Sequence, residues 1–321
     1  MEFPAHFNLA QLPTPIVPVK NFFDEISGYR VWIKRDDLTG LELSGNKVRK
    51  LDFLVREAVE QGVERLITCG GVQSNHCRAT VYYARRLGLK TTLFLRGEKP
   101  AAPTGNYLLD LLAGADIHLI TPEQYRDVER LMAQERSRSP EKAYVIPEGG
   151  SNETGAWGYV KGFYEILEQV REQNLPIDTI VVATGSGGTH AGLLLGKLLS
   201  GSSLNVVSVN VCDDAPFFKR KISAIMKAFG EKYGHRITWS ERDIHIVDGY
   251  VGGGYGVIST KEGELIRRLA EREGLVIDPV YGAKAFRGLE EKLKAGEFPG
   301  KNILFIHTGG VFGVFPYGDR L

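Results

Sequence analysis

Short apolar stretches alternate with segments of helical periodicity along almost the whole chain. The apolar stretches are rich in β-forming residues, and the segments between them carry apolar residues at the three- and four-residue spacing of a helix. This alternation predicts an α/β protein built from βαβ units, with parallel sheets covered by helices on both faces. The expected strands are Arg65–Cys69, Lys90–Leu95, Asp116–Ile120, Ala143–Ile146, Thr179–Ala183, Asn205–Val211 and Asn302–His307. The expected helices are Lys47–Gln61, Asn75–Leu87, Thr104–Ala113, Pro122–Arg138 and one that begins near Thr189.

The composition is that of an ordinary globular protein. The chain has 321 residues, 43% of them hydrophobic and 25% charged, and its length predicts about two domains. A formal charge of +1 gives no reason to expect a nucleic acid or an acidic membrane as partner. The apolar runs are too short to span a bilayer. Three scattered cysteines and an N-terminus without a signal-like segment predict a reducing, cytoplasmic location.

A glycine-rich loop is expected between the strand 179–183 and the following helix. It consists of Gly185, Ser186, Gly187, Gly188 and Thr189. Ligands of parallel sheets bind where strands end, and free N–H groups at a helix N-terminus bind phosphate. The loop is no Walker motif, because no Gly-Lys-Ser/Thr follows, and it lacks the final glycine of a dinucleotide fingerprint. It therefore predicts a site for a single phosphate on a small cofactor.

A second polar loop follows the strand 65–69. Ser74 is expected to cap the next helix, with Asn75 and His76 in its first turn. Such an N-terminus suits a carboxylate or a phosphate, although an ordinary serine cap explains the pattern equally well. A Ser-His hydrolase is disfavoured, because the Gly-x-Ser-x-Gly elbow is absent here.

Lys47 directly follows Gly45 and Asn46 and opens a predicted helix. A helix N-terminus disfavours an ammonium, and a neutral lysine amine attacks carbonyls, so this position suits a Schiff-base lysine. A surface lysine is the ordinary alternative. No His-x-x-x-His or Cys-x-x-Cys pair exists, so no metal site is expected. A reactive lysine together with a site for one phosphate predicts pyridoxal 5'-phosphate (PLP).

Seven motifs run along nearly the whole chain: Trp32–Gly40, Ser44–Leu51, Gln73–His76, Tyr144–Asn152, Gly155–Tyr159, Asp278–Tyr281 and His307–Gly310. Together they resemble the D-cysteine desulfhydrase and 1-aminocyclopropane-1-carboxylate (ACC) deaminase family. The resemblance implies the tryptophan synthase β-like PLP fold (fold type II), with two parallel-sheet domains covered by helices. It also implies a large domain of residues 1–49 and 158–321, a small inserted domain of residues 50–157, a small amino-acid substrate and a homodimer.

The resemblance also implies roles for individual residues. Lys47, rather than the neighbouring Lys50, matches the lysine that binds PLP. Ser74, Asn75 and His76 match the loop that holds the substrate carboxylate and faces the cofactor, with Asn75 reaching the PLP 3′-oxygen. The remaining matches are the phosphate loop (Gly185, Ser186, Gly187, Gly188 and Thr189), the two active-site tyrosines (Tyr255 and Tyr281) and Thr308 at the ring nitrogen.

Two positions separate the reactions within the family. ACC deaminases carry Glu directly after the second tyrosine and Leu before the final Gly-Gly, where this chain has Gly282 and Thr308. A carboxylate would keep the ring nitrogen protonated and strengthen the electron sink, whereas a hydroxyl supplies only a neutral hydrogen bond. A weaker sink suffices when sulfur leaves. The sequence therefore predicts D-cysteine desulfhydrase, which yields pyruvate, hydrogen sulfide and ammonia.

In that reaction Lys47 is expected to act as general base, Tyr281 to assist thiolate departure, and Ser74 to orient the carboxylate. The nearest alternatives are ACC deamination to α-ketobutyrate and ammonia, or a related β-elimination. Gly282 departs from the Thr or Ser often found there, which leaves side-chain specificity open. A non-catalytic binding protein is disfavoured by the intact catalytic set, and a nicotinamide oxidoreductase by the unmatched glycine fingerprint.

Overall fold

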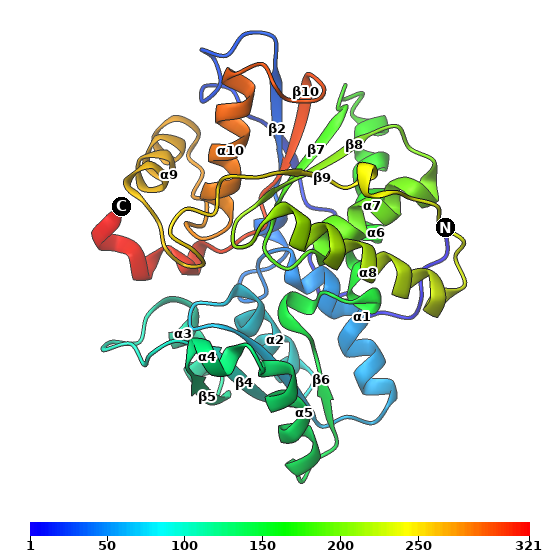
Figure 1. Ribbon diagram of the computed structural model, residues 1–321, viewed down its shortest axis with the longest axis vertical. Coiled ribbons are helices and arrows are strands. Elements are labelled where there is room, and N and C mark those ends of the chain that lie inside the picture. The colour runs from blue at the N-terminus through cyan, green and yellow to red at the C-terminus, as the bar shows by residue number, and fades with distance from the viewer.

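The computed structural model describes all 321 residues and contains two β-sheets, one above the other in Figure 1. The larger sheet is parallel except for its antiparallel edge strand β1. Its order is β1 (Ile16–Pro18), β2 (Arg30–Lys34), β10 (Asn302–Ile306), β7 (Thr179–Thr184), β8 (Asn205–Asn210) and β9 (His245–Val247).

The smaller sheet is parallel throughout. Its order is β5 (Asp116–Ile120), β4 (Lys90–Arg96), β3 (Arg65–Gly71) and β6 (Ala143–Val145). All four of its strands lie between residues 65 and 145, whereas the strands of the larger sheet lie before 35 and after 178. The domain boundaries at 49/50 and 157/158 stay a prediction.

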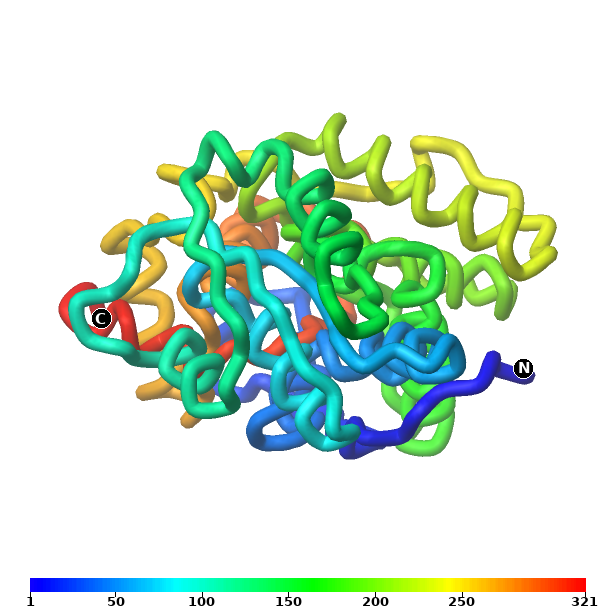
Figure 2. Tube along the Cα trace, turned by 90° about the horizontal axis from the view of Figure 1, so that it is seen from below, coloured from blue at the N-terminus to red at the C-terminus, as the bar shows by residue number.

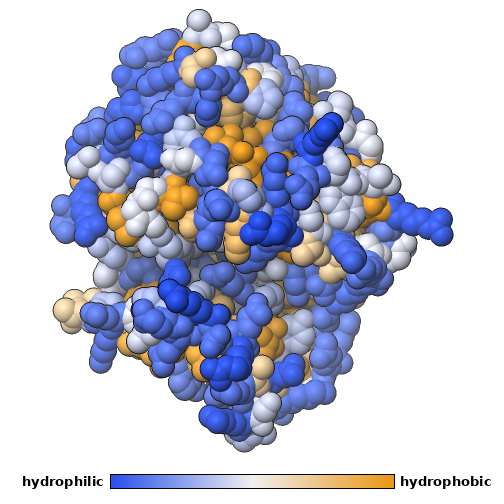
Figure 3. Space-filling model, in the orientation of Figure 1, coloured by the Kyte–Doolittle hydropathy of each residue, from blue (hydrophilic) through white to orange (hydrophobic).

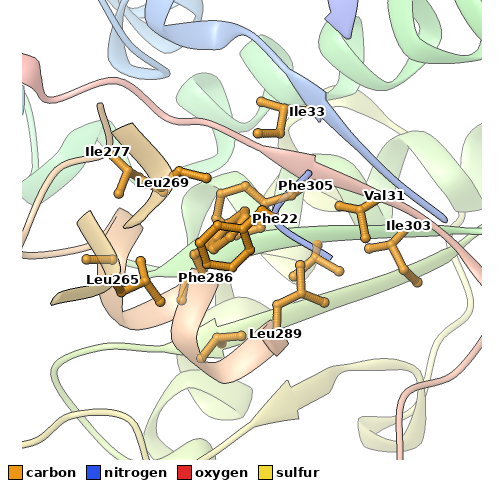
Figure 4. Packing of buried hydrophobic residues seen from close by; sticks show 14 of the residues in the cluster. Phe22, Val31, Ile33, Leu265, Leu269, Ile277, Phe286, Leu289, Ile303 and Phe305 are labelled. Atoms are coloured by element: carbon orange, nitrogen blue, oxygen red, sulfur yellow. The ribbon is translucent and has the colours of Figure 1, made fainter. Parts of the chain in front are cut away.

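The larger sheet is covered on both faces because its strands are apolar on both faces, as buried parallel strands are. Val181 and Phe305 belong to one buried cluster, together with residues of α9 (Thr260–Glu273) and α10 (Gly282–Lys294) (Figure 4). Their neighbours Ile180 and Leu304 belong to another cluster, with residues of α6 (Glu153–Glu172) and α7 (Gly188–Ser200). α8 (Ala215–Tyr233) packs on α6 and α7.

Around the smaller sheet lie α2 (Asn75–Arg86), α3 (Gly105–Leu112), α4 (Pro122–Tyr125) and α5 (Val128–Arg138) (Figure 1). The prediction of one helix over Pro122–Arg138 is wrong, because the chain breaks at Arg126 and Asp127 and a second helix begins at Val128. Short 3₁₀ turns complete the structure: η1 (Asp36–Leu38), η2 (Glu148–Gly150), η3 (Glu241–Asp243), η4 (Val311–Gly313) and η5 (Phe315–Arg320).

Helix α1 (Lys47–Glu60) packs on both α2 and α6. The approach to α6 is close, since a Cβ at Gly158 would lie 2.5 Å from the carbonyl oxygen of Arg49. Arg49 also forms buried ion pairs with Asp36 (2.8 Å) and Glu165 (2.9 Å). The helix that carries Lys47 is therefore fixed to the larger sheet and to α6 at its first turn.

The outer surface is mainly hydrophilic on the face seen in Figure 3, with hydrophobic residues in separate patches. The two termini lie on opposite sides of the molecule, both in the ribbon of Figure 1 and in the Cα trace of Figure 2. None of the helices is both long enough and apolar enough to cross a membrane.

Candidate active site

A cavity of about 330 Å³ lies where strands of both sheets end. Its wall includes the carboxyl ends of β3 and β4 from the smaller sheet, and the loops after β7, β8 and β10 from the larger sheet. The structure thus brings the predicted site residues together, with Gly188 alone outside the cavity wall. Those in the wall are Lys47, Ser74, Asn75, His76, Gly185, Ser186, Gly187, Thr189, Tyr255, Tyr281 and Thr308.

The two neighbouring lysines of α1 have different surroundings. Lys47 is the first residue of the helix and lies in the cavity wall, where its amine has no hydrogen-bond partner in the protein. Burial lowers the pKa of Lys47 to about 8, although Glu148 and Asp278 act in the opposite sense. Lys50 lies behind the wall and donates to the carbonyl oxygen of Gly149 (3.2 Å) and to Ser151 Oγ (3.3 Å). Only Lys47 therefore presents a free amine to a ligand.

The glycine loop has the form of an anion site. Gly187 adopts a left-handed conformation (φ +83°) immediately before α7, and the backbone N–H groups of Ser186 and Gly187 have no acceptor in the protein. The N–H of Gly188 differs, because it donates to Ser151 Oγ (3.2 Å). Ser151 Oγ also lies 2.8 Å from Ser186 Oγ, so the buried Lys50 is linked to the loop through two hydroxyls.

The second polar loop is built as the sequence predicts. Ser74 caps α2 by accepting a hydrogen bond from the N–H of Cys77 (3.2 Å), and Asn75 is the first helical residue. Asn106 orients Asn75 by donating to its Oδ1 (2.9 Å), which leaves the Asn75 amide group free to donate. The N-terminus of α2 therefore offers fixed donors to an anionic group in the cavity.

His76 is buried beneath this loop, 4% exposed. Its Nε2 lies 2.9 Å from Thr68 Oγ1, which itself donates to the carbonyl oxygen of Ile146. Thr68 Oγ1 can then only accept, so His76 carries its proton on Nε2. Burial, reinforced by Lys47 and Lys50, holds the pKa of His76 well below its ordinary value. His76 is therefore neutral, and it contributes shape and polarity to the wall rather than charge.

The two tyrosines form a pair. Tyr281 Oη donates to Tyr255 Oη (2.9 Å), and the rings meet edge to face with centroids 5.9 Å apart. Burial raises the pKa of Tyr255 and of Tyr281, so both phenols stay protonated at neutral pH. The pair can donate a proton or a hydrogen bond to a group in the cavity.

Thr308 is held against the loop that precedes Lys47. Its carbonyl oxygen accepts from the N–H of Asn46 (3.1 Å) and would lie 2.6 Å from a Cβ at Gly45, whose φ is +108°. Only glycine fits position 45, for both reasons. At the other discriminating position, a Cβ on Gly282 would lie 2.4 Å from Ile277 Cγ1, so Ile277 fills the space of a side chain there.

Several polar residues of the wall were not found from the sequence. They are Arg96, Tyr125, Glu148, His190 and Asp213. Three of them had a usable signal: Arg96, Glu148 and Asp213 each lie one or two residues after a predicted strand, and the carboxyl ends of parallel strands bind ligands. His190 directly follows the predicted phosphate loop, whereas Tyr125 lies in a helix and reaches the wall only through tertiary contacts.

The chain matches the family model described as pyridoxal-phosphate dependent enzyme over residues 7–309. A Thermotoga maritima protein named as a candidate ACC deaminase is 44% identical over 319 residues, which cover 98% of this chain and 99% of that protein. The Arabidopsis thaliana mitochondrial bifunctional D-cysteine desulfhydrase/ACC deaminase is 41% identical over 333 residues, which cover 99% of this chain and 81% of that protein.

A third relative, the D-cysteine desulfhydrase of Salmonella typhi, is 37% identical over 314 residues, which cover 95% of this chain and 94% of that protein. Among solved structures, one described as an ACC deaminase homologue superposes with a TM-score of 0.90 at 39% identity, and covers 98% of this chain and 95% of that one. The names of these relatives divide between two reactions.

Proposed function

Because this chain belongs to the ACC deaminase and D-cysteine desulfhydrase family of PLP-dependent enzymes, we propose that it is a β-eliminating lyase that acts on D-cysteine. The family membership, the PLP cofactor and fold type II predicted from the motifs are confirmed by these matches. The relatives' names do not distinguish D-cysteine from ACC, and the residues of the cavity support the choice of D-cysteine.

The cavity fits PLP by the chemistry of its donors. A free lysine amine at Lys47 suits the aldehyde carbon, and the unpaired N–H groups of Ser186 and Gly187 suit the phosphate. Lys50 supports that loop from behind, because it donates to Ser151 Oγ, which lies 2.8 Å from Ser186 Oγ. When bound, PLP supplies an electron sink for the charge left on the substrate Cα.

The protein residues divide the remaining tasks. Ser74 and the N-terminus of α2 bind the substrate carboxylate, which places the Cα hydrogen toward Lys47. The Lys47 amine, with a pKa of about 8, takes this proton as general base. Tyr281, protonated and now bonded to Tyr255, turns its hydroxyl to the substrate and donates a hydrogen bond to the sulfur, which leaves as hydrosulfide.

The observation that carries the choice of D-cysteine is the pair Gly282 and Ile277. Position 282 is glycine and so brings no carboxylate to the cavity, and Ile277 Cγ1 lies 2.4 Å from the place where a Cβ there would begin. The hydroxyl of Thr308 in the cavity wall then supplies a neutral partner for the ring nitrogen. This arrangement favours elimination of a good leaving group over the ring opening of ACC.

The test is a side-by-side assay of the yellow holoenzyme with D-cysteine, L-cysteine and ACC. We expect sulfide and pyruvate in equal amounts from D-cysteine, with a kcat/KM at least about tenfold above that for α-ketobutyrate formation from ACC. Comparable rates from D-cysteine and ACC would favour the alternative, an ACC deaminase or a bifunctional enzyme. Binding of PLP without turnover of any of the three would contradict the proposed function.

A further inference from the structure

Arg96 lies in the cavity wall between two aromatic rings. It is the last residue of β4, and its guanidinium carbon is 4.6 Å from the centre of the Tyr125 ring and 4.8 Å from that of the Tyr255 ring. Such stacking fixes the plane of a guanidinium and leaves its N–H edges free. Arg96 is thus a rigid, partly buried cation beside the catalytic tyrosine pair.

The Arg96 guanidinium has no anionic partner in the protein and donates no hydrogen bond to it. Glu148, in the same wall, accepts from the Tyr125 hydroxyl (2.6 Å) and lies 3.8 Å from Lys221. By contrast, the fully buried Arg78 of α2 has acceptors for its side chain on the backbone of Ser44 and on Asn106. A guanidinium held in a cavity without acceptors is suited to a ligand anion.

The other anionic groups of the proposed ligands have sites elsewhere. The cofactor phosphate suits the glycine loop at the start of α7, and the substrate carboxylate suits Ser74 at the start of α2. What remains for Arg96 is the substituent on the substrate Cβ. Arg96 stacks on Tyr255, which is bonded to Tyr281, so this cation is on the side of the cavity where the leaving group is expected.

We propose that Arg96 is a specificity-determining residue that pairs with negative charge on the β-substituent of the substrate. In the elimination, the electrons of the Cα–H bond form the Cα=Cβ bond, and the C–S bond breaks with its electron pair on sulfur. The Cα proton stays on the Lys47 amine, and hydrosulfide leaves with its charge facing Arg96. This inference rests on the proposed function and extends it to amino acids whose β-substituent is an anion or leaves as one.

The test measures binding of two unreactive amino acids to the holoenzyme through the cofactor absorbance. D-Aspartate carries an anion on Cβ and D-alanine carries a hydrogen, and the L-enantiomers are titrated in parallel. We expect Arg96→Gln to lower the affinity for aspartate relative to alanine by about tenfold, with alanine affinity nearly unchanged. Arg96→Lys, which keeps the charge, should retain part of the preference.

Arg136→Gln is the matched control, because Arg136 is exposed on α5 and lies outside the cavity. An equal loss for aspartate and alanine would assign Arg96 to the α-carboxylate and overturn the proposal, as would no change in either. Unaltered cofactor absorbance and unfolding temperature of Arg96→Gln show that the variant is folded. A wild-type enzyme that releases no sulfide would contradict the proposed function, whereas the aspartate-to-alanine ratio reports on Arg96 independently.

Discussion

At the scale of single residues, hydrogen bonds distinguish side chains that look alike in the sequence. Lys47 and Lys50 lie one helical turn apart, but only Lys47 has an amine without a protein acceptor. Burial lowers the pKa of both, and for Lys50 the charges of Lys47 and Lys221 add to the effect. One lysine is therefore free to react, and the other supports the loop expected to hold phosphate.

The lowered pKa of Lys47 gives a prediction for covalent capture of PLP by the apo-protein. An amine attacks only as the free base, so the capture rate should rise with pH and level off above about 8. Stopped-flow absorbance across the pH range measures this rate. Lys47→Ala should lose capture and sulfide release while PLP stays bound through its phosphate. Undiminished sulfide release by Lys47→Ala would contradict the assignment.

At the scale of elements, α10 positions both tyrosines of the cavity pair. Tyr281 lies directly before the helix, and Lys284 in its first turn reaches the loop that carries Tyr255. Lys284 Nζ donates to the carbonyl oxygens of Val251 (2.7 Å) and Gly254 (2.8 Å). The loop is glycine-rich, so a buried lysine replaces the packing that side chains would provide. We therefore expect Lys284 to hold the loop that carries Tyr255 in place.

Lys284→Met should lower kcat/KM by about tenfold, because Tyr255 loses its fixed place while the cofactor site is untouched. Hydrogen exchange should accelerate in residues 249–257 alone. In a Tyr255→Phe background the same substitution should add little, which separates positioning from general loss of stability. Lys292→Met, on the outer part of the same helix, is the control. Equal exchange rates in wild type and Lys284→Met would refute this role.

At the scale of the whole molecule, the cavity depends on the joint between α1, the larger sheet and α6. Arg49 and Asp36 form a buried ion pair there, which Glu165 and Lys34 extend. Tyr159 also donates to Asp36 (2.5 Å). Burial alone would raise the pKa of Asp36, but Arg49 reverses this and the pKa is lowered. Lys34, Asp36 and Arg49 lie within the sequence motifs described above. We therefore expect them to stabilise the fold and not to take part in the reaction.

Asp36→Asn should lower the free energy of unfolding by about 3–5 kcal/mol, because it leaves Arg49 buried with less compensating charge. Urea denaturation of the apo-protein at pH 7 measures this. Since the pKa of Asp36 is lowered on folding, its contribution to the free energy of unfolding is present above about pH 4 and is lost as the pH falls toward the folded pKa.

Asp37→Asn is the control. It breaks only the partly exposed pair with Arg35 and should lower the free energy of unfolding by at most about 1 kcal/mol. Equal costs for the two variants would contradict the network.

The sequence predicts most of the elements that lead into the site, because each joins an apolar strand to a glycine-rich or polar helix start. Ser74 at the cap of α2 and the loop before α7 are examples. It does not predict the break at Arg126, because helical spacing continues across it. Nor does it predict the position of Arg96 between Tyr125 and Tyr255, since three distant segments meet there. The expected homodimer stays a prediction.

The backbone contact between Gly45 and Thr308 has a consequence for redesign of the enzyme. The loop that ends in Lys47 and the loop that carries Thr308 touch without intervening side chains and share the bond from Asn46 to the Thr308 carbonyl oxygen. Variants at position 308 can change the hydroxyl without displacing the lysine, because the contact is made by the main chain. A library that seeks a new reaction can therefore vary position 308 together with Ile277 and Gly282, and should keep Gly45 fixed.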